Sequence, residues 1–578
     1  MRLLTLALDY DGTVTRDDRL GDVMRQAIGF ARTRGIFVVL VTGRIVPELR
    51  RVAGELHFVD AVVAENGGAL HFPETGHTTR LAPAVPPAFV DEISRRGIAF
   101  RAGESLVDAD AEDAPRLLDV IRALELPLVL AFNKGRVMIL PQGVSKATGL
   151  RTALDTFRLS ARNTLAIGDA ENDHELLRIA EVGVAVPWAS GALRRVADVT
   201  LTGSDVGSVA NYIRELATLG TLPATSQNRR SLLLGHLEDG AQFRLGVCGR
   251  NVLVAGDTRS GKSWVAGLLA EQLILLGYCV CVLDPEGDYR SLEALPGVVV
   301  LGGEDPPPSV RELTRALRYP DRSVVVDLSR VPLDEKVAYI RSTLPALNLL
   351  RARSGLPHRI VIDEAHYFLH DDGAEGLLDL QRNGYTVATY CASRLPKALL
   401  DATEVMIVTC ESSPSELEML HRACHERAPC ALPDFSMLQT LRPGQAVALP
   451  VTAEAGGQLQ LFTVAARLTP HVRHRQKYVD VPVSEQRSFV FGSATRIRTL
   501  RAFVRHLESQ PPQGLWPFIQ RGDFSRWVKD VFGDHALAAD LRALEGQYRG
   551  APNAETVGAL VDAIRARYDL RDTTAEVA

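Results

Sequence analysis

The chain has 578 residues, which is too long for a single hydrophobic core, and 46% of them are hydrophobic and 23% charged, as in ordinary globular proteins. Its 65 basic and 70 acidic residues give a formal net charge of −5, which excludes an overall basic field for nucleic acid or a membrane surface. The longest apolar runs are too short or too interrupted to cross a bilayer, so no membrane partner is expected. Seven cysteines, an odd number, predict reduced thiols and a cytoplasmic location.

Residues 1–217 alternate short apolar runs with segments of helical periodicity. The apolar runs include LLTLAL, FVVLVTG, DAVVAEN and TLAIGD, and polar residues gather at their carboxyl ends. Such alternation predicts a doubly wound parallel sheet, whose site lies at the carboxyl ends of the strands. Between about residues 80 and 142 the pattern changes to two helices and several short strands, which predicts a cap over that edge.

Four motifs in this region resemble those of the haloacid dehalogenase (HAD) superfamily, and the cap resembles that of its Cof-type branch. The sequence DYDGT has Asp9 and Asp11, VTGR has Thr42, Gly43 and Arg44, GVSKATGL has Lys146, and AIGDAENDHELL has Asp169 and Asp173. Any one of these motifs is equally well explained by a turn or a helix cap. Four of them in order, after predicted strands, favour an active site.

The resemblance implies a Mg²⁺-dependent phosphatase that acts on a phosphorylated small molecule. Asp9 is the expected nucleophile, which forms an aspartyl-phosphate, and Asp11 is the expected acid for the leaving group and base for water. The expected metal ligands are Asp9, the backbone carbonyl of Asp11, Asp169 and, directly or through water, Asp173. The residues expected to hold or neutralise the phosphate are Thr42, Gly43, Arg44 and Lys146.

A second α/β region is predicted at residues 231–480, after a polar, turn-forming linker at residues 218–230. An apolar run, the sequence GDTRSGKS and a helical segment follow one another there, which is the context of a P-loop. The expected ATP-binding residues are Gly256, Asp257, Thr258, Arg259, Ser260, Gly261, Lys262 and Ser263. Backbone amides and a helix N-terminus favour phosphates at such a loop, Lys262 reaches the outer phosphates, and Ser263 ligates Mg²⁺.

About a hundred residues further on, RIVIDEAHYFL supplies the remaining groups for ATP hydrolysis. Asp363 is expected in the Mg²⁺ shell, and Glu364 is expected to polarise the attacking water. A glutamate beside the aspartate favours water over another acceptor, so an ATPase is predicted rather than a kinase.

The sequences GYCVCVLDPEGDY and VIDEAHYFL resemble the HerA/FtsK branch of P-loop motors. The resemblance implies a RecA-like ATPase domain, a homo-oligomeric ring with a hexamer favoured, and DNA as a candidate partner. It also implies that Asp284, Glu286 and Asp288 lie beside the site rather than in it. Two features depart from that branch: the HAD-like domain occupies the place of an N-terminal β-barrel, and no Gln follows the sensor strand. The residues that could replace this Gln are Thr389, Ser393 and Arg394, and either Arg382 or Arg394 could serve a neighbouring subunit as an arginine finger.

Residues 485–578 are predicted to form a small, mostly helical domain with no identifiable chemistry. Before it, the basic stretch at residues 471–480 could meet nucleic acid, although a solvated connecting strand is the favoured interpretation. The cluster HRACHERAPC contains His421, Cys424, His425 and Cys430, but its spacing matches no standard zinc pattern, and helix-surface residues are favoured.

Three functions fit the whole sequence. The leading prediction is a bifunctional phosphohydrolase, in which a HAD phosphatase is fused to a ring-forming, HerA-like ATPase. The first alternative is a polynucleotide end-processing enzyme that combines a 3′-phosphatase with a 5′-kinase. The second is a regulatory assembly that binds ATP without catalysis.

Overall fold

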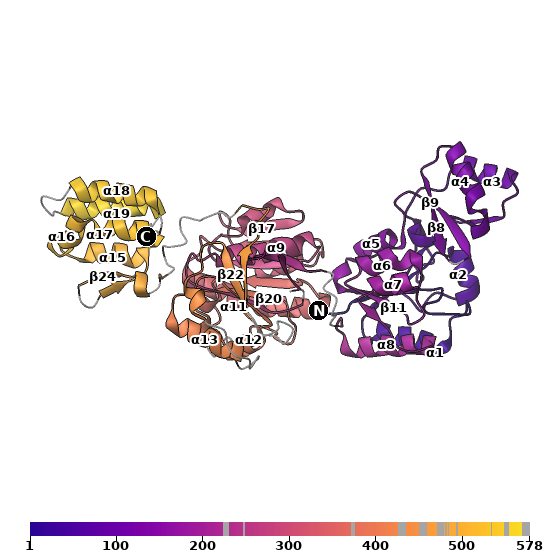
Figure 1. Cartoon of the computed structure of the whole chain (residues 1–578), viewed down its shortest axis with the longest axis horizontal. Helices are drawn as coiled ribbons and strands as arrows, with labels where there is room; N and C mark the ends of the chain where they lie inside the picture. Colours follow the sequence, from indigo (N-terminus) through magenta and orange to yellow (C-terminus); the bar gives the residue numbers. More distant parts are fainter. Residues whose placement is uncertain are drawn as a thin grey trace.

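Three parts follow one another along the chain, and the N-terminus lies between the first and the second (Figure 1). The computed structural model describes residues 1–133, 135–223, 230–246, 249–370, 376–425, 435–449, 459–470, 479, 482–483, 485–492, 495–532, 534–547 and 554–568. Residues 224–229 of the expected linker, and all of the basic stretch at residues 471–480 except residue 479, lie outside these ranges. No helix among the described residues is long and apolar enough to cross a membrane.

The first part is an eight-stranded sheet in the order β12-β11-β10-β1-β2-β3-β4-β5, with helices on both faces. The pairs from β12 to β3 are parallel, and β4 and β5 are antiparallel additions at one edge. Its strands are β1 Thr5–Asp9, β2 Phe37–Val41, β3 Ala61–Ala64, β4 Ala69–His71, β5 Thr78–Arg80, β10 Thr164–Gly168, β11 Val182–Ala185 and β12 Val199–Thr200. Its helices are α1 Asp22–Thr33, α2 Val46–Ala53, α5 Lys146–Phe157, α6 His174–Ile179, α7 Gly191–Val196 and α8 Val206–Leu219.

The central strands of this sheet are apolar throughout because both faces are covered. Every residue of β1 and β10 is buried, and the two strands pair in register from Thr5 with Thr164 to Leu8 with Ile167. Continuous burial is the pattern expected of parallel strands between helices. It leaves only the strand ends for polar chemistry.

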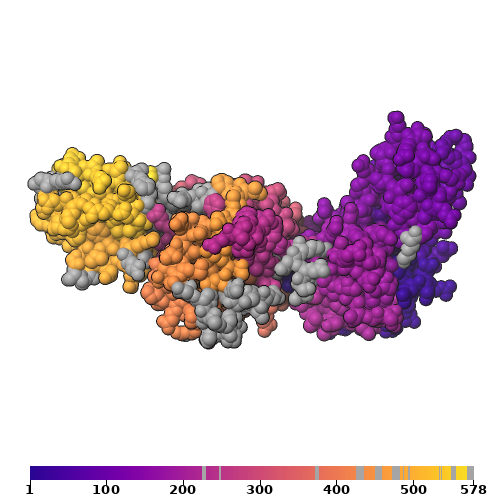
Figure 2. Space-filling view, in the orientation of Figure 1, coloured from indigo at the N-terminus to yellow at the C-terminus, as the bar shows by residue number. Residues whose placement is uncertain are grey.

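The predicted cap forms a separate lobe that projects from the first part (Figure 2). It is a four-stranded antiparallel sheet in the order β6-β7-β9-β8, with two helices packed on one face. Its elements are α3 Pro87–Arg95, β6 Phe100–Ala102, β7 Val107–Asp110, α4 Ala114–Ala123, β8 Leu128–Asn133 and β9 Arg136–Pro141.

The second part is an eleven-stranded sheet in the order β14-β13-β23-β22-β21-β15-β20-β19-β16-β18-β17. The strands are β13 Leu232–Leu237, β14 Gln242–Leu245, β15 Val252–Ala255, β16 Val280–Asp284, β17 Val298–Gly302, β18 Ser323–Asp327, β19 Arg359–Ile362, β20 Tyr385–Thr389, β21 Val405–Val408, β22 Gln445–Leu449 and β23 Gln460–Val464. The helices are α9 Lys262–Leu275, α10 Val310–Ala316, α11 Leu333–Ser354, α12 Lys397–Asp401 and α13 Pro414–His425. The strands from β21 to β17 are parallel and two antiparallel hairpins close one edge, which is the expected RecA-like arrangement.

The third part is mostly helical, as predicted, with one short hairpin. Its elements are β24 Phe489–Phe491, β25 Thr495–Ile497, α15 Leu500–Ser509, α16 Pro512–Arg521, α17 Asp523–Trp527, α18 His535–Gln547 and α19 Ala554–Tyr568. Phe489, Phe503, Phe524 and Trp527 pack as an aromatic core, with ring centroids 4.9–5.4 Å apart. Such tilted aromatic contacts stabilise a small core beyond the effect of the buried area alone.

Candidate functional sites

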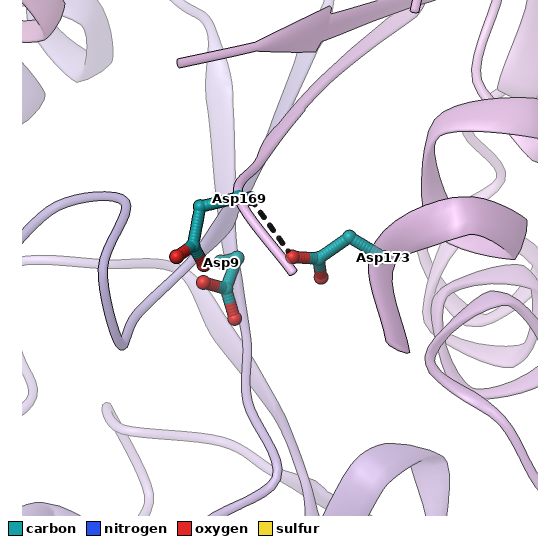
Figure 3. A group of neighbouring side chains, drawn as sticks. All are labelled: Asp9, Asp169 and Asp173. Atoms are coloured by element: carbon teal, nitrogen blue, oxygen red, sulfur yellow. Dashed lines mark hydrogen bonds between the residues drawn. The ribbon is translucent and has the colours of Figure 1, made fainter. Parts of the chain in front are cut away.

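Three carboxylates of the first part lie together at the carboxyl ends of adjacent strands (Figure 3). Asp9 ends β1, Asp169 follows β10, and Asp173 ends the short helix Glu171–Asp173. One oxygen from each lies within 4.8 Å of the others, and all three residues are buried. Asp173 is held in place because its Oδ2 accepts the backbone N–H groups of Asp169 and Ala170, each at 3.0 Å.

Lys146 joins this cluster from the first turn of α5, which Ser145 caps. Its Nζ lies 2.6 Å from Oδ1 of Asp9 and 2.6 Å from Oδ1 of Asp173. Burial alone would lower the pKa of Lys146, but the charges of Asp173 and Asp9 outweigh it and raise the pKa. Lys146 therefore stays cationic, as the prediction of a charge-balancing residue requires.

The cluster has the chemistry of a Mg²⁺ site. One lysine balances at most one charge of three buried carboxylates, and burial together with Asp173 raises the pKa of Asp9 well above its usual range. Oδ2 of Asp9 is buried without a hydrogen-bond partner among the described residues. A hard divalent cation would supply both the missing charge and the missing partner. The expected ligands Asp9, Asp169 and Asp173 therefore fit the ion.

The second strand brings the expected phosphate-binding loop to the same edge. Thr42 is fully buried and its Oγ1 accepts the backbone N–H of Arg44. The Arg44 side chain, however, faces carboxylates: it donates three hydrogen bonds to Asp11 and one to Asp18, at 2.6–3.0 Å. In this conformation Arg44 holds the expected acid–base residue Asp11, and its role as a phosphate ligand stays a prediction.

The cap covers this loop with apolar side chains, which the sequence pattern did not single out. Met138 of β9 lies so close to Gly43 that a Cβ on the glycine would come 2.9 Å from its sulfur. Met138 packs with Leu106 and Leu140 of the cap and with Ile45 beside the loop. The part of the cap that packs against the phosphate-binding loop is thus apolar.

The second site forms where β15 meets α9. Gly256 and Gly261 have φ angles of 143° and 109°, which only glycine adopts without strain, and they let the loop turn around a phosphate. Lys262 is buried and donates from Nζ to the carbonyl of Asp257 at 2.9 Å. The backbone N–H of Asp257 donates to the Cys410 carbonyl, and Ser260 bonds Thr409, so β21 braces the loop.

Ser263 and Asp363, the two expected protein ligands of a nucleotide-bound Mg²⁺, lie next to each other. Oγ of Ser263 lies 3.3 Å from Oδ2 of Asp363, and Oδ1 of Asp363 accepts the backbone N–H of Glu364. Glu364 is 1% exposed and has a φ of 47°, an uncommon conformation for a residue with a side chain. The P-loop with Gly256 and Gly261, the side chain of Lys262, and the pair of Ser263 and Asp363 together fit ATP with Mg²⁺.

Other predicted residues have structural partners. Asp284 accepts four backbone N–H groups of residues 286–289, so it shapes the loop beside the site, as expected. Thr258 is half-buried in the P-loop, and the exposed Arg259 donates to the Val531 carbonyl of the third part. Cys424 packs in the hydrophobic core, whereas Cys430 and the side chain of His425 lie outside the described residues.

Comparisons with known proteins match the two sites to two families. A family model described as haloacid dehalogenase-like hydrolase matches residues 6–100 and 101–213. A model described as the central domain of the helicase HerA matches residues 233–329.

Curated relatives are similar to the first part. The phosphoglycolate phosphatase of Halorubrum lacusprofundi is 31% identical over 226 residues, which are 37% of this chain and 97% of that protein. The phosphoglycolate phosphatase of Methanopyrus kandleri is 29% identical over 236 residues, which are 36% and 94% of the two chains. Among solved structures, a haloacid dehalogenase-like hydrolase from B. subtilis is 18% identical, with a TM-score of 0.33 over 37% of this chain and all of the other.

Proposed function

The chain belongs to the haloacid dehalogenase-like hydrolases through its first part and carries a HerA-type ATPase domain behind it, and from this premise we propose that it hydrolyses two different phosphate compounds at two separate sites. The observation that carries the first activity is the buried cluster of Asp9, Lys146 and Asp173, with Nζ 2.6 Å from both carboxylates. The observation that carries the second is the meeting of Ser263 and Asp363 beside the P-loop.

At the first site Asp9 is the nucleophile. Its carboxylate forms a bond to phosphorus as the bond from phosphorus to the leaving alcohol breaks, which leaves an aspartyl-phosphate. Asp11 gives a proton to the departing oxygen and then takes one from the water that hydrolyses the intermediate. Lys146 orients Asp9 and favours its ionised form. A Mg²⁺ would be held by Asp9, Asp169, the carbonyl of Asp11 and, directly or through water, Asp173, and it would neutralise the charge of these carboxylates and of the phosphate.

The substrate is proposed to be a short phosphorylated acid such as 2-phosphoglycolate. The similar proteins from Halorubrum lacusprofundi and Methanopyrus kandleri are named phosphoglycolate phosphatases. The apolar cap residues Leu106, Met138 and Leu140 lie over the phosphate-binding loop, and a cap at this place favours a small leaving group over a nucleic-acid chain. This argues against a polynucleotide 3′-phosphate, the substrate of the end-processing alternative.

Phosphate release from a panel of phosphate esters tests this function. The panel runs from 2-phosphoglycolate through hexose phosphates to a DNA 3′-phosphate, with Asp9→Asn as the control. We expect Mg²⁺-dependent phosphate release from the short esters. The rate of this release should be at least a thousandfold lower in Asp9→Asn. If no ester releases phosphate, or if phosphate release is unchanged in Asp9→Asn, the assignment is wrong.

At the second site ATP hydrolysis is proposed to use Glu364 to polarise water, Lys262 to hold the outer phosphates, and Ser263 with Asp363 to hold the Mg²⁺. We further propose that the ATPase assembles as a ring with a hexamer favoured, and that DNA is its cargo. The match of residues 233–329 to the HerA central domain supports both proposals.

Two measurements test the ATPase proposals. ATP turnover is measured with and without DNA, with Glu364→Gln as the control that binds but does not hydrolyse. Mass in solution is measured with and without ATP, and a particle of about six chains is expected with ATP. A monomer under both conditions contradicts the ring, and transfer of phosphate to a 5′-hydroxyl DNA end would favour the kinase alternative instead.

A further inference from the structure

The sensor-strand position next to the P-loop is held by Thr389, which ends β20 between β15 and β19. Its Oγ1 lies 3.1 Å from Nδ1 of His366 and accepts the backbone N–H of Cys391 at 3.0 Å. Ser393, another candidate for this position, is engaged elsewhere, because its backbone N–H and its hydroxyl both bond to Glu416.

His366 stands between this threonine and the expected catalytic glutamate. Its Nδ1 lies 3.7 Å from Oε2 of Glu364, and both side chains are at most 2% exposed. The ring packs against Tyr367 and Tyr390, with centroids 4.1 and 4.2 Å apart, so it has little freedom to turn. His366 thus connects the end of β20 with Glu364. Glu364 directly follows Asp363, the expected Mg²⁺ ligand after β19.

His366 is a neutral ring that is held through Nδ1. Burial, partly opposed by Glu364 and reinforced by Lys262, lowers the pKa of His366 to about 4, so the ring is neutral. Oγ1 of Thr389 can donate to Nδ1 in one tautomer and accept from it in the other, so Thr389 holds the ring through Nδ1 in either case.

Two polar atoms are then left without partners among the described residues. Nε2 of His366 and Oε2 of Glu364 are both buried, and neither has a hydrogen bond there. An unpaired buried polar group costs about 1–3 kcal/mol, so such atoms indicate a bound molecule that the chain itself does not supply. Two such atoms beside a P-loop suit a water molecule that faces a phosphate, because water both donates and accepts hydrogen bonds.

We infer that His366 is a positioning residue of the ATPase, which holds Glu364 and the attacking water in place, and that Thr389 fixes its orientation from the sensor strand. The inference rests on the proposed ATP hydrolysis at this site. It assigns to Thr389 and His366 together the role that a glutamine after this strand would otherwise fill.

The test uses the full chain and a matched pair of substitutions at Thr389. Thr389→Val keeps the shape and removes the hydroxyl, whereas Thr389→Ser keeps the hydroxyl. We expect His366→Ala and Thr389→Val to lower the kcat for ATP at least tenfold, with KM and the Kd for ADP changed by less than twofold. Thr389→Ser should retain at least half of the wild-type kcat.

An unchanged Kd for ADP reports whether the second part of each variant is folded, and His366→Asn provides a second variant if His366→Ala is unstable. Full ATP turnover in folded His366→Ala and Thr389→Val contradicts the inference, as does an equal loss in Thr389→Ser. If wild-type protein and Glu364→Gln both fail to hydrolyse ATP, the ATPase proposal itself is wrong, so the two failures are distinguishable.

Discussion

Nε2 of His358 in the second part lies 3.0 Å from Oδ1 of Asn163 in the first part. His358 directly precedes β19, which leads to Asp363, and Asn163 directly precedes β10, which leads to Asp169. Nδ1 of His358 accepts the backbone N–H of Cys279, so the proton lies on Nε2 and is donated to Asn163. This hydrogen bond therefore joins the amino ends of two strands whose carboxyl ends carry the two sites.

Other contacts between the two parts lie at the same ends of the strands. Glu181, which precedes β11, accepts the hydroxyl of Tyr278 at 2.8 Å and lies 3.3 Å from Nη1 of Arg230. Because each sheet turns its amino edge to the other, the sites face away from each other. Two strands of about five residues at roughly 3.3 Å each place them on the order of 30 Å apart or more. A shared active site is excluded by this arrangement.

The two activities are therefore expected to be separable by single substitutions. Lys262→Ala should abolish ATP turnover, because it removes the cation that holds the outer phosphates, and leave phosphate release at the first site within twofold of wild type. Asp9→Asn should abolish phosphate release at the first site and leave ATP turnover within twofold of wild type. Steady-state rates of both reactions on each variant check this, and a tenfold loss at the site that was not substituted would instead show coupling across the interface.

The hydrogen bond between His358 and Asn163 is expected to stabilise the contact between the two parts. His358→Ala and Asn163→Ala should each destabilise the protein, and the double variant should be destabilised by about 0.5–1.5 kcal/mol less than the sum. Denaturant unfolding of the four proteins measures this coupling. Asn211→Ala, at an exposed position on α8, is the control and should change little; strict additivity of the first two substitutions would contradict the prediction.

Acid is expected to weaken the same contact. Burial, reinforced by the positive charges of Arg162, Arg351 and the N-terminus, lowers the pKa of His358 to about 3, against about 6.5 in an unfolded chain. A protonated ring also could not accept the N–H of Cys279. The unfolded state therefore binds a proton that the folded state does not, and the stability that this histidine contributes is complete above pH 6.5 and declines toward pH 3.

The measurement is thermal unfolding at pH 7 and pH 5 for wild type and His358→Gln. Wild type should lose up to about 1.4 kcal/mol per pH unit more than the variant, since glutamine has no such proton to bind. Equal acid sensitivity of the two proteins would show that His358 does not carry this effect.

Lys146 is expected to be essential for phosphate release and important for stability. Lys146→Met keeps the length of the side chain but leaves Asp9 and Asp173 buried without their cation, which costs about 3–5 kcal/mol for a broken buried pair. The kcat should fall at least a hundredfold. Arg151→Met, on an exposed turn of the same helix, is the control and should retain full activity. Normal turnover by Lys146→Met would remove Lys146 from the site.

Local sequence patterns were sufficient to predict much of the fold and the position of both candidate sites. Apolar runs that end in polar residues predicted the parallel strands and placed Asp9, Thr42, Asp169 and Asp363 at their carboxyl ends, because parallel strands share one functional edge. GDTRSGKS predicted the P-loop because backbone conformation there depends on glycine, which is visible in a single short stretch. These features are local, so the order of residues along the chain is sufficient to find them.

Tertiary structure alone decided which distant groups meet. The sequence carried no signal that Arg44 would hold Asp11, that Met138 of the cap would cover Gly43, or that His366 would lie between Thr389 and Glu364. It also left open how the two sites relate, which the bond between Asn163 and His358 settles across 195 residues of chain. Such contacts depend on how whole sheets pack against each other, and no local spacing encodes that.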